Sequence, residues 1–185
     1  MINEIFRDAR ERMEKTISTT HTELGKIRTG RANLSLLDTV RVSYYGSVVP
    51  LNQVANLGVP EPRMITIQPW DRNILPEIEK AILKADLGIT PNNDGHLIRL
   101  PIPQLTEERR KDLVKLVHQM GEDGKVAIRN IRRDVIDHLR KAQREHQISE
   151  DEEYNGGIDI QDLTDDYVKK IDEKVAAKEK EIMEV

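Results

Sequence analysis

Three arginines stand within five residues of one another, at Arg129, Arg132 and Arg133. A guanidinium group is planar and always charged, and it can donate paired hydrogen bonds to phosphate oxygens. At 100° per residue, a helix through this segment places further cations within roughly 60° of Arg129, namely Lys111, Lys115, Lys125, Arg140 and Arg144. Apolar residues such as Val117, Ile131 and Val135 fall on the opposite face. The pattern predicts a basic helix face that binds phosphate-rich RNA.

A solvated helix face is the alternative interpretation of such a charge stripe. The choice of arginine over lysine favours phosphate binding, because lysine alone would provide solubility. Tyrosine, tryptophan and phenylalanine are absent from the stripe, so we expect contacts to the RNA backbone more than stacking on bases. Tyr44, Tyr45 and Trp70 are expected to pack against a small sheet, with an exposed partner surface as the second interpretation.

The net charge of −4 conceals an uneven distribution of charge along the 185 residues. Residues 105–146 carry eleven basic and eight acidic residues, whereas residues 147–185 carry five basic and thirteen acidic ones. The acidic final segment therefore hides a basic segment before it. We expect such a local basic face to bind phosphate in one orientation and with an affinity that falls as salt rises.

Several classes of chemistry have no support in the sequence. The chain has no cysteine, which excludes disulfides and thiolate catalysis. Its five histidines lack ligand-like spacing, and phosphate-binding glycine loops, zinc-protease motifs and serine-hydrolase motifs are missing. We therefore expect no enzyme, no metal site and no cofactor. The chain has no long apolar run or basic leader, so we expect no membrane contact and a cytoplasmic location.

Three long amphipathic helices are predicted from apolar residues spaced three and four apart. The first runs from Ile2 to about Thr29, with Gly25 inside it. The basic helix runs from Thr106 to about His146, with Gly121 and Gly124 as weak points. Ser149–Glu152 is a capping box for the third helix, whose start we expect to be frayed or broken near Ile158 because of Gly156-Gly157.

Between the first two helices the pattern changes to that of a small α/β unit. Alternating or short apolar runs predict strands at residues 40–45, 48–49, 54–59, 64–67 and 97–100. Pro76–Leu83 predicts a short helix with an early proline. The fold class is therefore α+β: an elongated three-helix bundle of residues 1–30 and 105–185, with an inserted α/β domain of residues 31–104.

The chain crosses twice between these bodies, at Gly30-Arg31 and at Pro103-Gln104. Glycine on one crossing and proline on the other predict a two-stranded hinge. A fixed elbow is the alternative.

The sequence resembles the bacterial ribosome recycling factor family over nearly its whole length. The resemblance is carried in order by residues 26–32, 42–46, 50–53, 86–88 with 91–92, 105–113 and 126–134. It implies an L-shaped protein that is expected to be a monomer. Such a factor binds the post-termination ribosome on the large subunit and, with elongation factor G and GTP, promotes dissociation into subunits and release from mRNA.

The same resemblance implies roles for particular residues. The positions that match the family's RNA-binding arginines are Arg28, Arg110, Arg129, Arg132 and Arg133. Ribosomal RNA and elongation factor G are the implied partners, the latter meeting residues 31–104. Two other functions stay open: a helical scaffold whose basic stripe meets an acidic partner, which specific ribosome binding would exclude, and an enzyme in the α/β insertion, which a turnover screen would reveal.

Overall fold

The computed structural model describes residues 1–184, so Val185, the last residue of the predicted bundle, lies outside the described residues. The chain divides into two compact units. Unit 1 contains Met1–Arg28 and Glu107–Glu184, and unit 2 contains Thr29–Thr106. Long helices in one unit and a small sheet with one helix in the other confirm the predicted α+β class.

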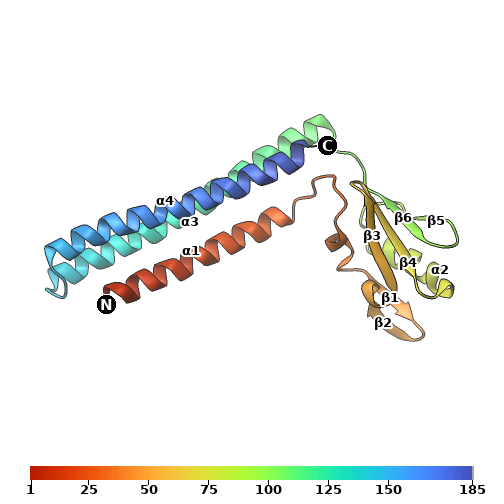
Figure 1. The fold of residues 1–185 in the computed structure, drawn as a ribbon, viewed down its shortest axis with the longest axis horizontal. Helices are drawn as coiled ribbons and strands as arrows, with labels where there is room; N and C mark the ends of the chain where they lie inside the picture. Colours follow the sequence, from red (N-terminus) through yellow and green to blue (C-terminus); the bar gives the residue numbers. More distant parts are fainter. Residues whose placement is uncertain (185) are drawn as a thin grey trace. The chain divides into compact units, whose positions relative to one another are not determined.

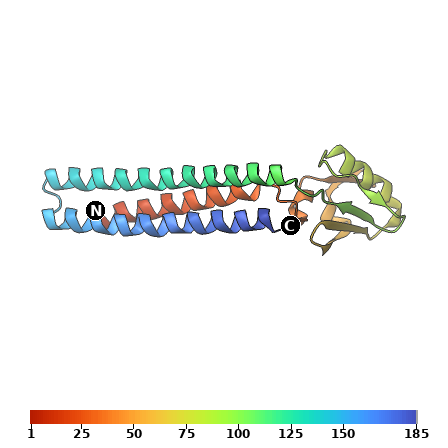
Figure 2. The same cartoon turned by 90° about the horizontal axis from the view of Figure 1, so that it is seen from above.

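Unit 1 consists of three helices that lie side by side (Figures 1 and 2). They are α1 (Ile2–Gly25), α3 (Glu107–Arg144) and α4 (Glu150–Met183). Their apolar stripes meet in a shared core, which includes Met13, Ile17, Ile128, Leu139, Ile160 and Ile171. The three predicted helices are confirmed.

Helix α1 ends at Gly25, four residues before the predicted end. The chain then tightens, because the amides of Lys26 and Ile27 bond to the carbonyls three residues back, Glu23 O and Leu24 O. Gly25 is exposed and a Cβ there would touch nothing within 4 Å. A glycine that gains no packing costs about 1 kcal/mol relative to alanine in a helix, which favours an end at this position.

The glycines of α3, predicted as weak points of the helix, are close-packing positions. A Cβ on Gly121 would lie 2.5 Å from Val175 Cγ2, and one on Gly124 would lie 2.9 Å from Thr20 Oγ1. These residues belong to α4 and α1, so the two glycines let both neighbours approach α3. Helix α3 is continuous through them.

The predicted break at the start of α4 is also wrong, since the helix is continuous from Glu150. The capping box is confirmed: Ser149 Oγ accepts from the Glu152 amide at 3.1 Å, and Glu152 Oε2 accepts from the Ser149 amide at 2.7 Å. This bond to the Ser149 amide lowers the pKa of Glu152. Gly156 is buried, and a Cβ there would lie 2.8 Å from Leu139 Cδ1. Capping and packing together outweigh the low helix propensity of the glycine pair.

Unit 2 contains a hairpin, a four-stranded sheet and a helix. Strands β1 (Arg41–Tyr44) and β2 (Ser47–Pro50) form the hairpin. Its two-residue turn has positive φ at Tyr45 (46°) and Gly46 (84°), as tight hairpins require. The second sheet has the order β3-β4-β6-β5, all antiparallel.

The sheet strands are β3 (Ala55–Glu61), β4 (Met64–Pro69), β5 (Asn92–Asn93) and β6 (Ile98–Pro101), and the helix is α2 (Leu75–Lys84). Short 3-10 turns lie at Leu34–Leu37, Leu51–Gln53 and Arg72–Ile74. Buried residues from α2 and the strands form one core, among them Ile65, Ile67, Ile78, Ile82, Ile98 and Leu100. The two-residue strand β5 was not predicted, because asparagine has low strand propensity.

Candidate nucleic-acid interface

Contacts to the other two helices show which way each side of α3 faces. Arg12 of α1 pairs with Asp134 at 2.7 Å, so this side of α3 meets α1. Arg132 and Lys125 bond to Gln161 and Asp172 of α4, so their side meets α4. The basic residues therefore lie along the α3–α4 boundary and the outer surface next to it.

Arg132 is half-buried and is held by a short chain of side-chain hydrogen bonds. Its Nη1 donates to Gln161 Oε1 at 3.0 Å, and Gln161 Nε2 donates to Asp165 Oδ1 at 2.8 Å. Only part of the guanidinium fork is used in this way, since it has five N–H donors. Arg132 is thus oriented by α4 and keeps donors for a ligand. Gln161 had no signal in the sequence, because the contact joins residues that are 29 positions apart.

Arg129 and Arg133 are cations without a committed partner. Arg129 is half-buried and Arg133 is exposed. Within residues 1–184, neither side chain makes a hydrogen bond or an ion pair. Two guanidinium groups one helical turn apart, next to an oriented third, can bind adjacent phosphates of one RNA strand.

Lys125 differs from the other members of the predicted stripe. Its Nζ pairs with Asp172 of α4 and, at 3.3 Å, with Glu122. The hydrogen bond to Asp172 raises the pKa of Lys125, and only 17% of its side chain is exposed. This lysine joins α3 to α4, so we correct its expected place among the phosphate-binding cations.

The five predicted arginines do not form a single cluster. Arg28 follows the end of α1 and is exposed, whereas Arg110 lies in the first turn of α3 and is half-buried. Arg110 and Arg129 are 19 residues apart in one helix, which corresponds to about 29 Å at 1.5 Å per residue. An RNA surface that contacts both ends of this set must therefore be long.

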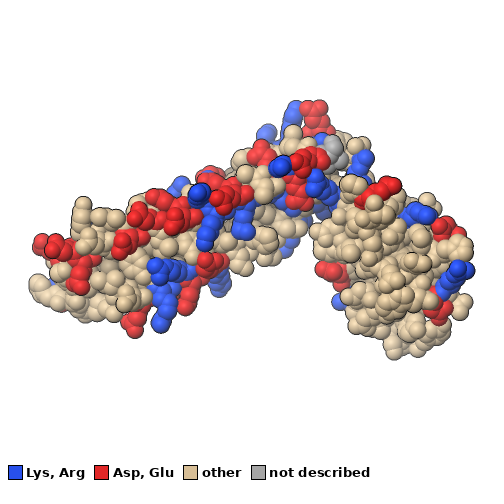
Figure 3. All heavy atoms as spheres, viewed as in Figure 1, with Lys and Arg blue, Asp and Glu red and all other residues tan. Residues whose placement is uncertain are grey.

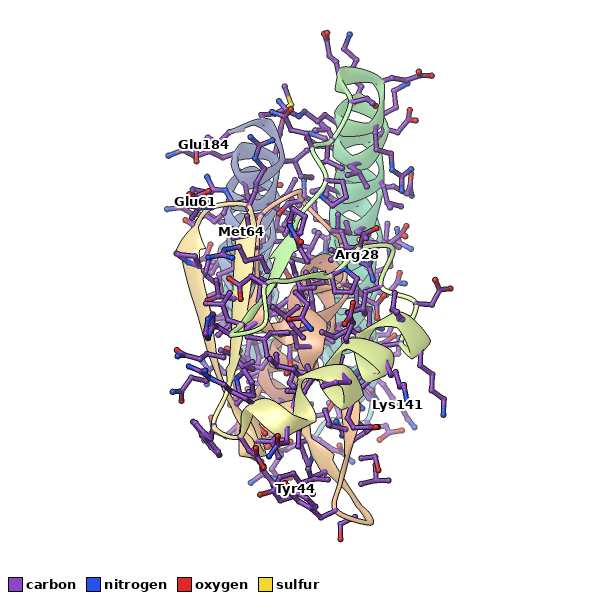
Figure 4. All side chains as sticks on the ribbon, turned by 90° about the vertical axis from the view of Figure 1, so that its right-hand side faces the viewer. Arg28, Tyr44, Glu61, Met64, Lys141 and Glu184 are labelled. Carbon is purple, nitrogen blue, oxygen red and sulfur yellow. The ribbon has the colours of Figure 1, made fainter. Side chains whose placement is uncertain are left out.

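The aromatic residues of unit 2 do not pack the sheet, contrary to the prediction. Tyr45 and Trp70 are 71% and 62% exposed, and Tyr44 and Val48 are also exposed. The Tyr44 and Tyr45 rings meet edge to face with centroids 4.7 Å apart, and Tyr45 Oη donates to Asp71 Oδ2. Figure 4 shows Tyr44 on the β1–β2 hairpin at the edge of unit 2. The hairpin turn carries these rings outward, because the core is already filled by aliphatic residues from α2 and the strands.

The part of the chain that the structure describes contains neither a group of metal ligands nor a membrane-spanning helix. Across residues 1–184, no three histidine, aspartate or glutamate side chains are grouped so that they could hold a metal ion. No helix in that range has the length and apolarity needed to cross a membrane.

Comparison with known proteins gives consistent matches. The family model described as ribosome recycling factor matches residues 20–183. The ribosome-recycling factor of Natranaerobius thermophilus is 55% identical over 181 residues, 98% of each chain. That of Bacillus licheniformis is 56% identical over 185 residues, the whole of both chains.

Two solved structures are similar over their full length. A solution structure of a ribosome recycling factor is 41% identical, with a TM-score of 0.75, and the match covers 100% of this chain and 98% of that one. The second is described as models for the T. thermophilus ribosome recycling factor and the E. coli elongation factor G bound to the E. coli post-termination complex. Its matching chain is 46% identical, with a TM-score of 0.63 and 99% coverage of each chain.

Proposed function

Because the chain belongs to the ribosome recycling factor family, we propose that it binds the large subunit of the post-termination ribosome. With elongation factor G and GTP it then promotes dissociation into subunits and release from mRNA. The relative described together with elongation factor G on a post-termination complex supports this assignment. We infer that the chain acts as a cytoplasmic monomer and performs no catalysis itself, so that GTP hydrolysis belongs to the elongation factor.

We infer that the bundle, residues 1–30 and 105–185, binds ribosomal RNA through Arg28, Arg110, Arg129, Arg132 and Arg133. The observation that carries this inference is that Arg129 and Arg133 are uncommitted within residues 1–184, beside Arg132, which α4 orients. Because Gln161 already orients Arg132, this guanidinium group loses less entropy when it binds phosphate than a free side chain does. The contacts are to the RNA backbone, so recognition depends on the shape of the folded RNA more than on its base sequence.

The inserted domain, residues 31–104, is proposed to meet elongation factor G and to move on a hinge at Gly30, Arg31, Pro103 and Gln104. Two backbone bonds support these positions. The Ala32 amide donates to Pro62 O at 2.7 Å, and the Ile102 amide donates to Arg63 O at 2.8 Å. Both chain segments are therefore anchored to unit 2 immediately beyond the proposed hinge residues, which supports a hinge at this point of each crossing.

Light scattering of post-termination ribosomes tests the proposed function. The chain, elongation factor G and GTP should together lower the scattering as subunits separate, and omission of any one should abolish the change. The triple variant Arg129→Ala, Arg132→Ala, Arg133→Ala should fold normally by circular dichroism but fail to co-sediment with large subunits. If the native chain neither binds nor separates ribosomes, the recycling function is wrong and the scaffold alternative gains support.

A further inference from the structure

A groove runs between α3 and α4 beside the turn that joins these helices. Ile136, Ile158 and Tyr154 form an apolar strip along it, and Leu139 and Gly157 also line it. Tyr154 is 72% exposed and Ile158 is 46% exposed. An aromatic and an aliphatic side chain exposed together at one groove are typical of a docking surface, where such side chains become buried.

The helix surface at Gly157 is uncovered, although packing within the protein does not require a glycine there. A Cβ at this position would touch nothing within 4 Å, in contrast with Gly156, which packs against Leu139. Glycine inside a helix costs about 1 kcal/mol relative to alanine. Packing thus explains Gly156 but leaves Gly157 unexplained. The missing side chain gives an incoming residue direct access to the helix backbone between Tyr154 and Ile158.

The charges around the groove identify the kind of ligand that fits it. Four carboxylates line it, namely Glu150, Glu153, Asp151 and Asp162, against a single cation, Arg140. In the described chain, residues 1–184, none of the four makes an ion pair or a side-chain hydrogen bond. The helix dipole accounts for the three acids in the first turn of α4, but Asp162 lies well beyond that turn. In Figure 3, the end of the bundle that holds the α3–α4 turn shows acidic and uncharged side chains on the visible face.

We propose that this groove binds an extended cationic protein segment. An arginine or lysine of the ligand lies over the Tyr154 ring and pairs with the carboxylates, and an apolar neighbour covers Gly157 and Ile158. RNA does not suit the groove, because four carboxylates repel phosphate. The groove adjoins the Arg129–Arg133 surface, because Gln161, which bonds to Arg132, also lines it, but the groove carries the opposite charge. Binding of the segment does not depend on the proposed recycling function.

The first test uses a fluorescein-labelled heptapeptide of alternating arginine and leucine as the probe, with the full-length chain at low salt. Fluorescence anisotropy should show saturable binding, and amide chemical-shift changes should centre on residues 150–162. Gly157→Gln fills the open surface without a change in charge. It should weaken binding about tenfold or more, the loss expected when a central contact is blocked, while raising the melting temperature of the protein. If the substitution instead damaged the fold, both the peptide affinity and the melting temperature would fall.

Charge-matched variants separate specific docking from general attraction. The pair Glu153→Gln with Asp162→Asn should weaken peptide binding, whereas Asp166→Asn with Glu173→Gln removes the same charge elsewhere on α4 and should not. Equal weakening by both pairs would overturn the proposal, and so would an absence of peptide binding. Preferential binding of an eight-residue oligouridine at residues 150–162 would also overturn it, because the ligand would then be RNA.

Discussion

Arg132 of α3 donates a 3.0 Å hydrogen bond to Gln161 of α4, and Gln161 is itself bonded to Asp165. The bond orients one guanidinium group of the proposed RNA surface before any ligand arrives. It also makes the α3–α4 pairing part of that surface, although all three predicted arginines of the cluster belong to α3.

Removal of the Gln161 amide should weaken ribosome binding without unfolding the bundle. In Gln161→Leu the Arg132 side chain loses its partner and regains rotamer freedom, which costs about 0.5–1.5 kcal/mol on binding. Co-sedimentation with large subunits should show a roughly twofold to twelvefold loss of affinity. Gln119→Leu is the control, because within residues 1–184 the Gln119 side chain bonds only to Asp123 of its own helix. An equal loss there would argue against the orienting role.

Arg129 and Arg133 should account for part of the salt dependence of binding. Each phosphate contact contributes a slope of about −0.7 to −0.9 in a plot of log affinity against log salt. The double variant Arg129→Ala, Arg133→Ala should therefore reduce the steepness by roughly 1.4–1.8. Lys80→Ala with Lys84→Ala removes the same charge from α2 of unit 2 and should leave the slope unchanged. An unaltered slope in the arginine variant would mean that the two residues form only a solvated helix face.

Gly121→Ala should destabilise the protein, although alanine is the better helix former. The new methyl group would lie 2.5 Å from Val175 Cγ2, and such overpacking costs about 1–3 kcal/mol. Urea denaturation measures the loss, and Val175→Ala should restore part of it in the double variant. Gly157→Ala is the matched control and should raise the free energy of unfolding by up to about 1 kcal/mol, because its Cβ meets nothing. Stabilisation at both sites would contradict the close-packing role of Gly121.

The pair formed by Glu14 and Tyr167 predicts a pH dependence of stability. Tyr167 is buried and donates to Glu14 at 2.6 Å. The bond lowers the pKa of Glu14, while burial and the same bond raise the pKa of Tyr167 to about 12. A carboxyl with a lowered pKa stabilises the fold above its unfolded-state pKa, and this contribution disappears as the pH falls through the folded-state value. The phenol contributes below pH ~10, its unfolded-state pKa, and this contribution is lost as the pH rises towards 12.

Tyr167→Phe should therefore cost about 0.5–1 kcal/mol of unfolding free energy at pH 7, measured by urea denaturation. The difference in unfolding free energy between the variant and the native chain should become smaller in acid, once Glu14 is protonated. It should also become smaller above pH ~10. A constant difference from pH 3 to pH 11 would mean that lost packing, and not the hydrogen bond, explains the effect.

Gly30→Val should impair subunit separation more than ribosome binding. Gly30 has φ of 78°, a value that β-branched residues rarely adopt, and its added Cβ would lie 3.3 Å from Leu105 Cγ. Strain of about 1–3 kcal/mol at a proposed hinge residue should change the preferred direction of the chain where it passes between the two units. Co-sedimentation and light scattering, measured on the same variant, distinguish the two steps. Gly95→Val is the control, since Gly95 also has positive φ (88°) but lies in the loop before β6.

Local patterns in the sequence predicted most of the elements and the chemistry that they carry. Apolar spacing defined α1, α3 and α4, the Ser149–Glu152 box defined the start of α4, and the close arginines pointed to phosphate. These signals are local, because helix periodicity, capping and side-chain type each act within a few residues. Residues 26–32 and 126–134, with the other matching segments, also identified the family.

Which side chains are available to a ligand, and what the glycines do, depends on contacts that exist in the folded chain alone. Lys125 and Arg129 look alike in the sequence, yet Asp172 of α4 engages the first and leaves the second uncommitted. Gly156 and Gly157 are neighbours, yet one packs against Leu139 and the other faces open space. Tyr45 and Trp70 lie outside a core that aliphatic residues already fill. Each outcome depends on contacts between residues far apart in the chain, and local propensity carries no information about such contacts.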